Sequence, residues 1–95
     1  MNIETQQIFE TAKEIYKDKD FQTVREILEE LLRSDSNNVE ILTLLGNTYY
    51  CLEDFNRSAN VYKKIVQIQP WNTQCLFNLA NVYSELKRYD TAIKL

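Results

Sequence analysis

The sequence has no histidine, one glycine and one proline among its 95 residues. Without histidine it lacks the commonest general base and metal ligand, and one glycine is too few for a glycine-rich phosphate loop. The acidic pairs Glu29-Glu30 and Glu53-Asp54 are expected on solvated faces and at turns, because a two-helix unit offers no pocket in which one carboxylate could serve as acid and the other as base. The sequence therefore predicts no catalytic residue, no cofactor and no metal site, and the chain is not expected to be an enzyme.

Clusters of basic residues and long apolar runs are also absent. The net charge is −3, and the adjacent basic pairs Lys63-Lys64 and Lys87-Arg88 are typical of solvated helix edges, so no nucleic-acid surface is expected. No apolar run approaches the roughly 20 residues that span a bilayer, and the first ten residues lack the parts of a secretory signal. Cys51 and Cys75 have no metal-ligand spacing, so reduced thiols and a cytoplasmic or nuclear location are expected.

What the chain does contain is a period of 34 residues. Residues 39–72 hold two stretches of apolar side chains at helical spacing, separated by a turn at Glu53-Asp54 and ended by Pro70. A shift of one period needs no gap and places Leu76, Leu79, Ala80 and Tyr83 over Leu42, Leu45, Gly46 and Tyr49. The chain is thus predicted to be one helical pair repeated, with helices at 3–18, 21–33, 39–52, 55–69 and 73–86 and a further one beginning at Tyr89.

The period, the helical pair and these residue types resemble the tetratricopeptide repeat family. The middle unit carries the pattern most fully, with Leu42, Leu45, Gly46, Tyr49, Ser58, Tyr62, Ile65 and Pro70. The resemblance implies an all-α, right-handed solenoid of antiparallel helix-turn-helix units at residues 5–38, 39–72 and 73–95, the last incomplete. Gly46 and its counterparts Ala12 and Ala80 share small size, which predicts that the partner helix approaches closely at this position.

By the same resemblance, the first helices of successive units line a concave groove that holds a protein or peptide partner. The expected groove residues are polar or aromatic: Phe9, Lys13, Thr43, Asn47, Tyr50, Gln74, Phe77, Asn78 and Asn81. For Phe9 and Phe77, packing against a neighbouring helix is an equally good interpretation. Trp71, in the loop after Pro70, either covers the junction between units or anchors a partner, and the first is favoured.

The last unit is expected to leave an apolar surface uncovered, an open end formed by Leu79, Tyr83, Leu86 and Tyr89. Three functional hypotheses follow. The first is a non-catalytic interaction module or scaffold subunit, part of a larger complex, with a peptide or a neighbouring subunit in its groove. The second is the N-terminal targeting arm of a larger enzyme. The third is a structural homo-oligomer assembled through the open end.

Overall fold

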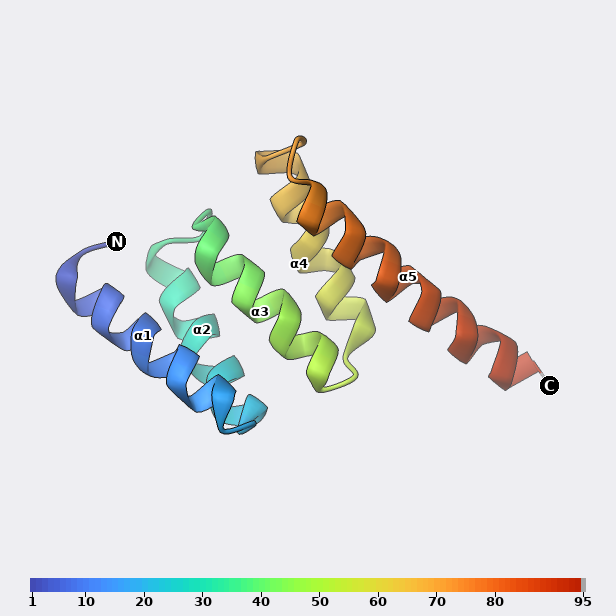
Figure 1. Cartoon of the computed structure of the whole chain (residues 1–95), viewed down its shortest axis with the longest axis horizontal. Coiled ribbons are helices and arrows are strands. Elements are labelled where there is room, and N and C mark those ends of the chain that lie inside the picture. Colours follow the sequence, from blue (N-terminus) through green and yellow to red (C-terminus); the bar gives the residue numbers. More distant parts are fainter. Residues whose placement is uncertain (95) are drawn as a thin grey trace.

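The computed structural model describes residues 1–94, with side chains up to residue 90, and consists of helices joined by short turns. The helices are α1 (Ile3–Lys17), α2 (Phe21–Ser34), α3 (Val39–Cys51), α4 (Phe55–Ile68) and α5 (Thr73–Lys94). They follow one another in a row, each packed against the next, and α1 also touches α3 (Figure 1). The described part contains no strand, which confirms the predicted all-α solenoid, and none of its helices is long and apolar enough to cross a bilayer.

Every helix begins at a side chain that accepts a backbone N–H from the first turn. Asparagine starts the first helix of each unit and aspartate starts the second helix of the first two units. These residues are Asn2, Asp20, Asn38, Asp54 and Asn72. Because a cap satisfies N–H groups that have no partner within the helix, these side chains fix where each helix begins.

The turn inside a unit has the same construction in the first two units. Lys19 and Glu53 adopt left-handed backbone conformations with φ of 66° and 60°, and the capping aspartate follows directly. Next to each turn lies an edge-to-face aromatic pair, Tyr16 with Phe21 at 5.2 Å and its counterpart Tyr50 with Phe55 at 5.3 Å between ring centroids. This packing offsets the cost of a left-handed residue that is not glycine.

The third unit lacks this turn, and the predicted break between residues 86 and 89 is wrong, because α5 runs without interruption from Thr73 to Lys94. Arg88 stands where the first two units have Asp20 and Asp54, and a guanidinium cannot accept the N–H groups of a helix start. Ser84 replaces the tyrosine of the aromatic pair. The third unit thus has neither the capping aspartate nor the aromatic pair that support the turn. A continuous helix therefore leaves fewer backbone N–H groups without a hydrogen-bond partner than a turn would.

The core consists of two clusters that follow one another along the row of helices. One joins α1, α2 and α3 around Leu28 and Ile41, and the other joins α3, α4 and α5 around Ile65 and Val82, all of them fully buried. Gly46 lies where α3 and α4 come closest: a Cβ atom there would be 2.5 Å from Cε1 of Tyr62. The expected close approach at this small residue is therefore present.

Candidate partner-binding groove

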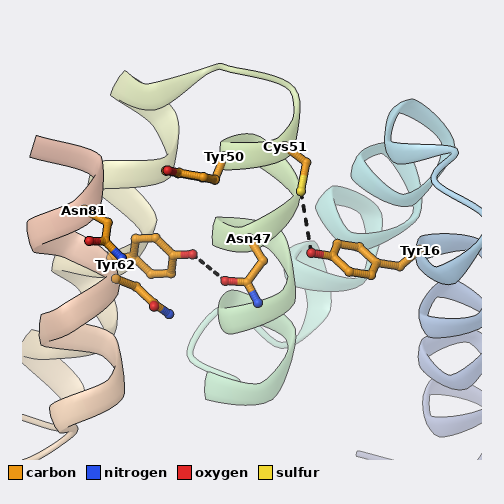
Figure 2. Close-up of a pocket in the computed structure, with 7 residues that line it drawn as sticks. Tyr16, Asn47, Tyr50, Cys51, Tyr62 and Asn81 are labelled. Carbon is orange, nitrogen blue, oxygen red and sulfur yellow. Dashed lines mark hydrogen bonds between the residues drawn. The ribbon is translucent and has the colours of Figure 1, made fainter. Parts of the chain in front are cut away.

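Three hollows that share lining residues lie among helices α1, α3, α4 and α5. The middle hollow, of about 180 Å³, is lined by Tyr16, Asn47, Tyr50, Cys51, Tyr62, Asn78 and Asn81 (Figure 2). Asn47 also lines a hollow of about 400 Å³ between α1 and α3. Asn78 also lines one of about 110 Å³ between α3, α4 and α5. Together they form the groove discussed below.

Two asparagines of the groove have their acceptor atoms occupied from inside the protein. The hydroxyl of Tyr62 donates to Oδ1 of Asn47, and Nε2 of Gln74 donates to Oδ1 of Asn78 at 3.1 Å. Neither Nδ2 group has a partner among the described residues, and the side chain of Asn81 makes no hydrogen bond to any of them. At Asn47 and Asn78 the groove therefore presents an Nδ2 donor beside an oxygen that already accepts one hydrogen bond.

Two of the tyrosine hydroxyls at the groove, those of Tyr16 and Tyr62, have raised pKa values. Burial, together with the hydrogen bond to Cys51 at 3.6 Å, raises the pKa of Tyr16 to about 12. Burial also raises the pKa of Tyr62 well above its usual value. Both hydroxyls thus serve as hydrogen-bonding groups rather than as acids or bases at neutral pH. Among the described residues no cluster of metal-ligand type is present.

The hollow between α1 and α3 has a mixed character. Phe9, Val39 and Leu44 contribute apolar walls, while Lys13 and Glu40 stand at its rim. The Nζ atom of Lys13 lies 3.0 Å from Glu10 and 5.3 Å from the centre of the Phe9 ring. An exposed ion pair of this kind contributes little to stability, so Lys13 can turn toward a ligand at small cost.

Most of the residues predicted for the groove line these hollows: Phe9, Lys13, Thr43, Asn47, Tyr50, Gln74, Asn78 and Asn81. Phe9 is only 4% exposed and belongs to the core, which favours the packing interpretation for this residue. Phe77, its counterpart, is 63% exposed and lines none of the three hollows. The difference arises because Phe9 packs in the core beside residues of α3, whereas none of the described residues buries Phe77.

The favoured expectation for Trp71 is wrong. Its side chain is 74% exposed and does not cover the junction between units.

At the expected open end, Leu79 and Leu86 are half-buried against α4, and Tyr89 packs on Phe55 with ring centroids 5.7 Å apart. Of that surface, Tyr83 remains largely uncovered, at 44% exposure.

Sequence reasoning missed Tyr16, Cys51 and Tyr62 as groove residues. The repeat register could have found Tyr16, because it is the counterpart of Tyr50 one period earlier. Tyr62 fits the core pattern of α4, and its ring is indeed buried. That its hydroxyl reaches Asn47 depends on the approach of α4 to Gly46, which no sequence pattern states.

Comparison with known proteins places these features in context. The family model for anaphase-promoting complex, cyclosome, subunit 3 matches residues 8–95. A probable UDP-N-acetylglucosamine–peptide N-acetylglucosaminyltransferase SEC of Arabidopsis thaliana is 28% identical over 87% of this chain and 8% of its own length. The protein O-mannosyl-transferase Tmtc3 of Drosophila melanogaster is 37% identical over 64% of this chain and 7% of its own length. The chain thus spans less than a tenth of either curated relative.

Among solved structures, MamA from Desulfovibrio magneticus RS-1 shares the fold. Its TM-score is 0.85 at 20% identity, over 97% of this chain and 52% of that one. MamA of MSR-1 gives a TM-score of 0.68 at 25% identity, over 83% of this chain and 45% of the other. The likeness extends over the whole row of helices and says nothing about ligands.

Proposed function

The chain belongs to the tetratricopeptide-type repeat family described as anaphase-promoting complex, cyclosome, subunit 3, and we propose that it is a non-catalytic interaction module whose groove binds an extended segment of a partner protein. The partner is a peptide segment or a neighbouring subunit of a larger assembly. The two free cysteines, one of them exposed, support a reducing intracellular location, cytoplasmic or nuclear.

One observation carries this proposal: among the described residues the Nδ2 donors of Asn47 and Asn78 have no partner, while Tyr62 and Gln74 donate to their Oδ1 atoms. Donors of this kind suit acceptor oxygens, and the acceptor that every peptide offers is its backbone carbonyl. Recognition through carbonyls depends little on the partner's side chains. Apolar side chains of the segment would rest on the walls of the neighbouring hollow formed by Val39 and Leu44.

The test replaces each donor by an isosteric acceptor. Asn47→Asp and Asn78→Asp keep the oxygen that Tyr62 or Gln74 donates to, but they remove the Nδ2 donors and oppose a carbonyl with a carboxylate. The probes are peptides selected from a displayed random library against the wild-type chain, with affinity measured by fluorescence anisotropy. We expect the double variant to bind about tenfold more weakly or worse, since two hydrogen bonds are lost.

The matched control is Asn37→Asp with Asn60→Asp, which makes the same charge change at exposed positions outside the three hollows. The control should retain peptide affinity, and both double variants should keep the wild-type thermal midpoint in circular dichroism. Equal peptide affinity in the Asn47/Asn78 variant and the control would contradict the proposal, as would a selection that enriches no binding peptide.

A second candidate is the N-terminal targeting arm of a larger enzyme, favoured by the similarity of this chain to a small part of each of two transferases. In that case the groove would hold a segment of the enzyme's substrate. The reading frame beyond residue 95 tests this candidate: a transferase domain after the repeats would support it, and further repeats alone would contradict it.

Self-assembly is the third candidate. It is favoured by the exposure of Leu76 and Tyr83, and sedimentation at several concentrations tests it.

A further inference from the structure

The middle hollow of the groove has no charged residue in its lining. Its seven lining residues are asparagines, tyrosines and one cysteine, whereas Lys13 and Glu40 line the neighbouring hollow between α1 and α3. Burial raises the pKa of Tyr16 to about 12 and also raises that of Tyr62, so neither hydroxyl supplies a negative charge at neutral pH. A charged group that entered this hollow would lose water without gaining an opposite charge, so the hollow disfavours it.

Asn81 is the lining amide that makes no hydrogen bond. Unlike Asn47 and Asn78, it has neither its oxygen nor its nitrogen bonded to any described residue. The hydroxyl of Tyr50 also has no hydrogen-bond partner there, while its ring packs edge-to-face on Phe55. Figure 2 shows Tyr50 extending from α3 in the direction of α5, the helix that carries Asn81. Each of these two side chains thus offers an unused donor and an unused acceptor to the same hollow.

A carboxamide with both ends unused is suited to one particular group. A primary carboxamide carries an N–H beside its C=O, so two of them can pair side by side through two hydrogen bonds. A trans peptide group points its N–H and its C=O in opposite directions, so a backbone amide can use only one end of Asn81. The hollow, of about 180 Å³, has room for a side chain rather than for a single water molecule.

We propose that the middle hollow binds the primary carboxamide of a glutamine or asparagine side chain, with Asn81 as its pairing partner and Tyr50 as a second hydrogen-bonding group. This inference rests on the proposed function and adds specificity to it. Asn47 and Asn78 hold backbone carbonyls of the bound segment whatever its sequence, and Asn81 selects one of its side chains. All the lining residues fall within residues 16–81, so the structure describes the whole of the lining.

The probes are the peptides that the wild-type chain selects from the displayed library. Each position of the tightest peptide is replaced in turn by glutamine, asparagine, glutamate, lysine and methionine, and affinity is measured by fluorescence anisotropy. Glutamate and methionine have about the length of glutamine but lack the carboxamide. We expect one position at which an amide side chain binds about tenfold more tightly than the other three, because it gains two hydrogen bonds and brings no unpaired charge.

The matched change in the chain is Asn81→Asp, which replaces the free Nδ2 group by a carboxylate oxygen. It should weaken binding of the amide peptide by about fivefold and strengthen binding of the lysine peptide by about tenfold, which reverses the preference at that position. Tyr50→Phe keeps the ring on Phe55 and should reduce the preference for the amide by about threefold.

The control is Asn60→Asp, which adds the same charge at an exposed position of α4 outside the three hollows. It should leave the preference for the amide unchanged. Circular dichroism checks that each variant is folded. An amide preference that Asn81→Asp turns into a lysine preference, and that Asn60→Asp preserves, would support the inference.

Two results would overturn the inference and leave the proposed function standing. In the first, peptides bind and depend on Asn47 and Asn78, but no position of the peptide favours an amide side chain. In the second, such a position exists, but Asn81→Asp affects it no more than Asn60→Asp does. A selection that enriches no peptide would instead contradict the proposed function, and this inference with it.

Discussion

The hydroxyl of Tyr49 donates a hydrogen bond of 2.6 Å to the carboxylate of Glu29, and this contact joins α3 of the second unit to α2 of the first. Arg25 holds the same carboxylate from the other side at 3.0 Å. Burial would raise the pKa of Glu29, but the hydrogen bonds from Tyr49 and Arg25 outweigh it and lower that pKa. The result is a polar bridge between units beside an otherwise apolar interface.

Replacing Tyr49 by Phe should lower the free energy of unfolding by about 1 kcal/mol, because a half-buried carboxylate loses a donor. Urea denaturation at neutral pH measures this. Glu29→Gln should cost less in this background than in the wild type, because the hydrogen bond from Tyr49 is already lost and only the interaction with Arg25 remains to be weakened. Additive losses from the two changes would show that the bond does not couple the units.

The same tyrosine gives a dependence on alkaline pH. Burial, and then the hydrogen bond to Glu29, raise the pKa of Tyr49 from 10.0 to about 12. Because the unfolded chain releases this proton at a lower pH than the folded chain, the stabilisation is complete below pH 10 and is lost as the pH rises toward 12. Urea midpoints across that range should fall less steeply in Tyr49→Phe than in the wild type. Parallel curves would contradict the shift.

Gly46→Ala should destabilise the chain by about 1–2 kcal/mol despite the better helix propensity of alanine, because the added methyl group overlaps the Tyr62 ring. The rescue is Tyr62→Leu in the same molecule, which gives these two positions the alanine and leucine that the first unit has at Ala12 and Leu28. The double variant should recover much of the loss in a thermal melt. A single variant as stable as the wild type would show that the ring moves aside freely.

Asp54→Ala should cost about 1 kcal/mol of stability, because it removes the cap of α4. Arg88→Ala, at the corresponding position of the third unit, should change stability by less than about 0.5 kcal/mol, because α5 needs no cap there. Thermal melts of the two variants compare them directly. A large loss in Arg88→Ala would contradict this expectation and would mean that the contacts of Arg88 with Glu85 and Tyr89 stabilise α5.

The two thiols should differ in reactivity. Cys51 is exposed, whereas Cys75 is 4% exposed, its Sγ atom lies 3.3 Å from the carbonyl oxygen of Tyr62, and burial raises its pKa. A thiol reagent such as Ellman's reagent should therefore titrate one equivalent quickly in the native chain and the second only in denaturant. Cys51→Ser should remove the fast phase. A fast phase that persists in this variant would mean that Cys75 is accessible.

The repeat period set most of the fold, because apolar spacing and capping residues act locally. Leu42, Leu45 and Tyr49 needed only a helical period to be recognised as a buried stripe. The end of α5 could not be found in this way. The break predicted between residues 86 and 89 was inferred from the register with the other units. Whether a new helix can begin there depends instead on whether the side chain of residue 88 can accept a backbone N–H group, and Arg88 cannot.

The sequence by itself determined the helices, their pairing and the absence of histidine chemistry, since these depend on residue type and spacing along one chain. Only the tertiary structure decided how side chains from different helices meet. In the tertiary structure Phe9 is buried in the core and Trp71 is exposed. The hydroxyl of Tyr62 donates to Oδ1 of Asn47, which leaves the Nδ2 group of Asn47 as the donor available to the groove. Contacts of this kind depend on how closely two helices approach, and that distance is set by the volumes of residues far apart in the sequence.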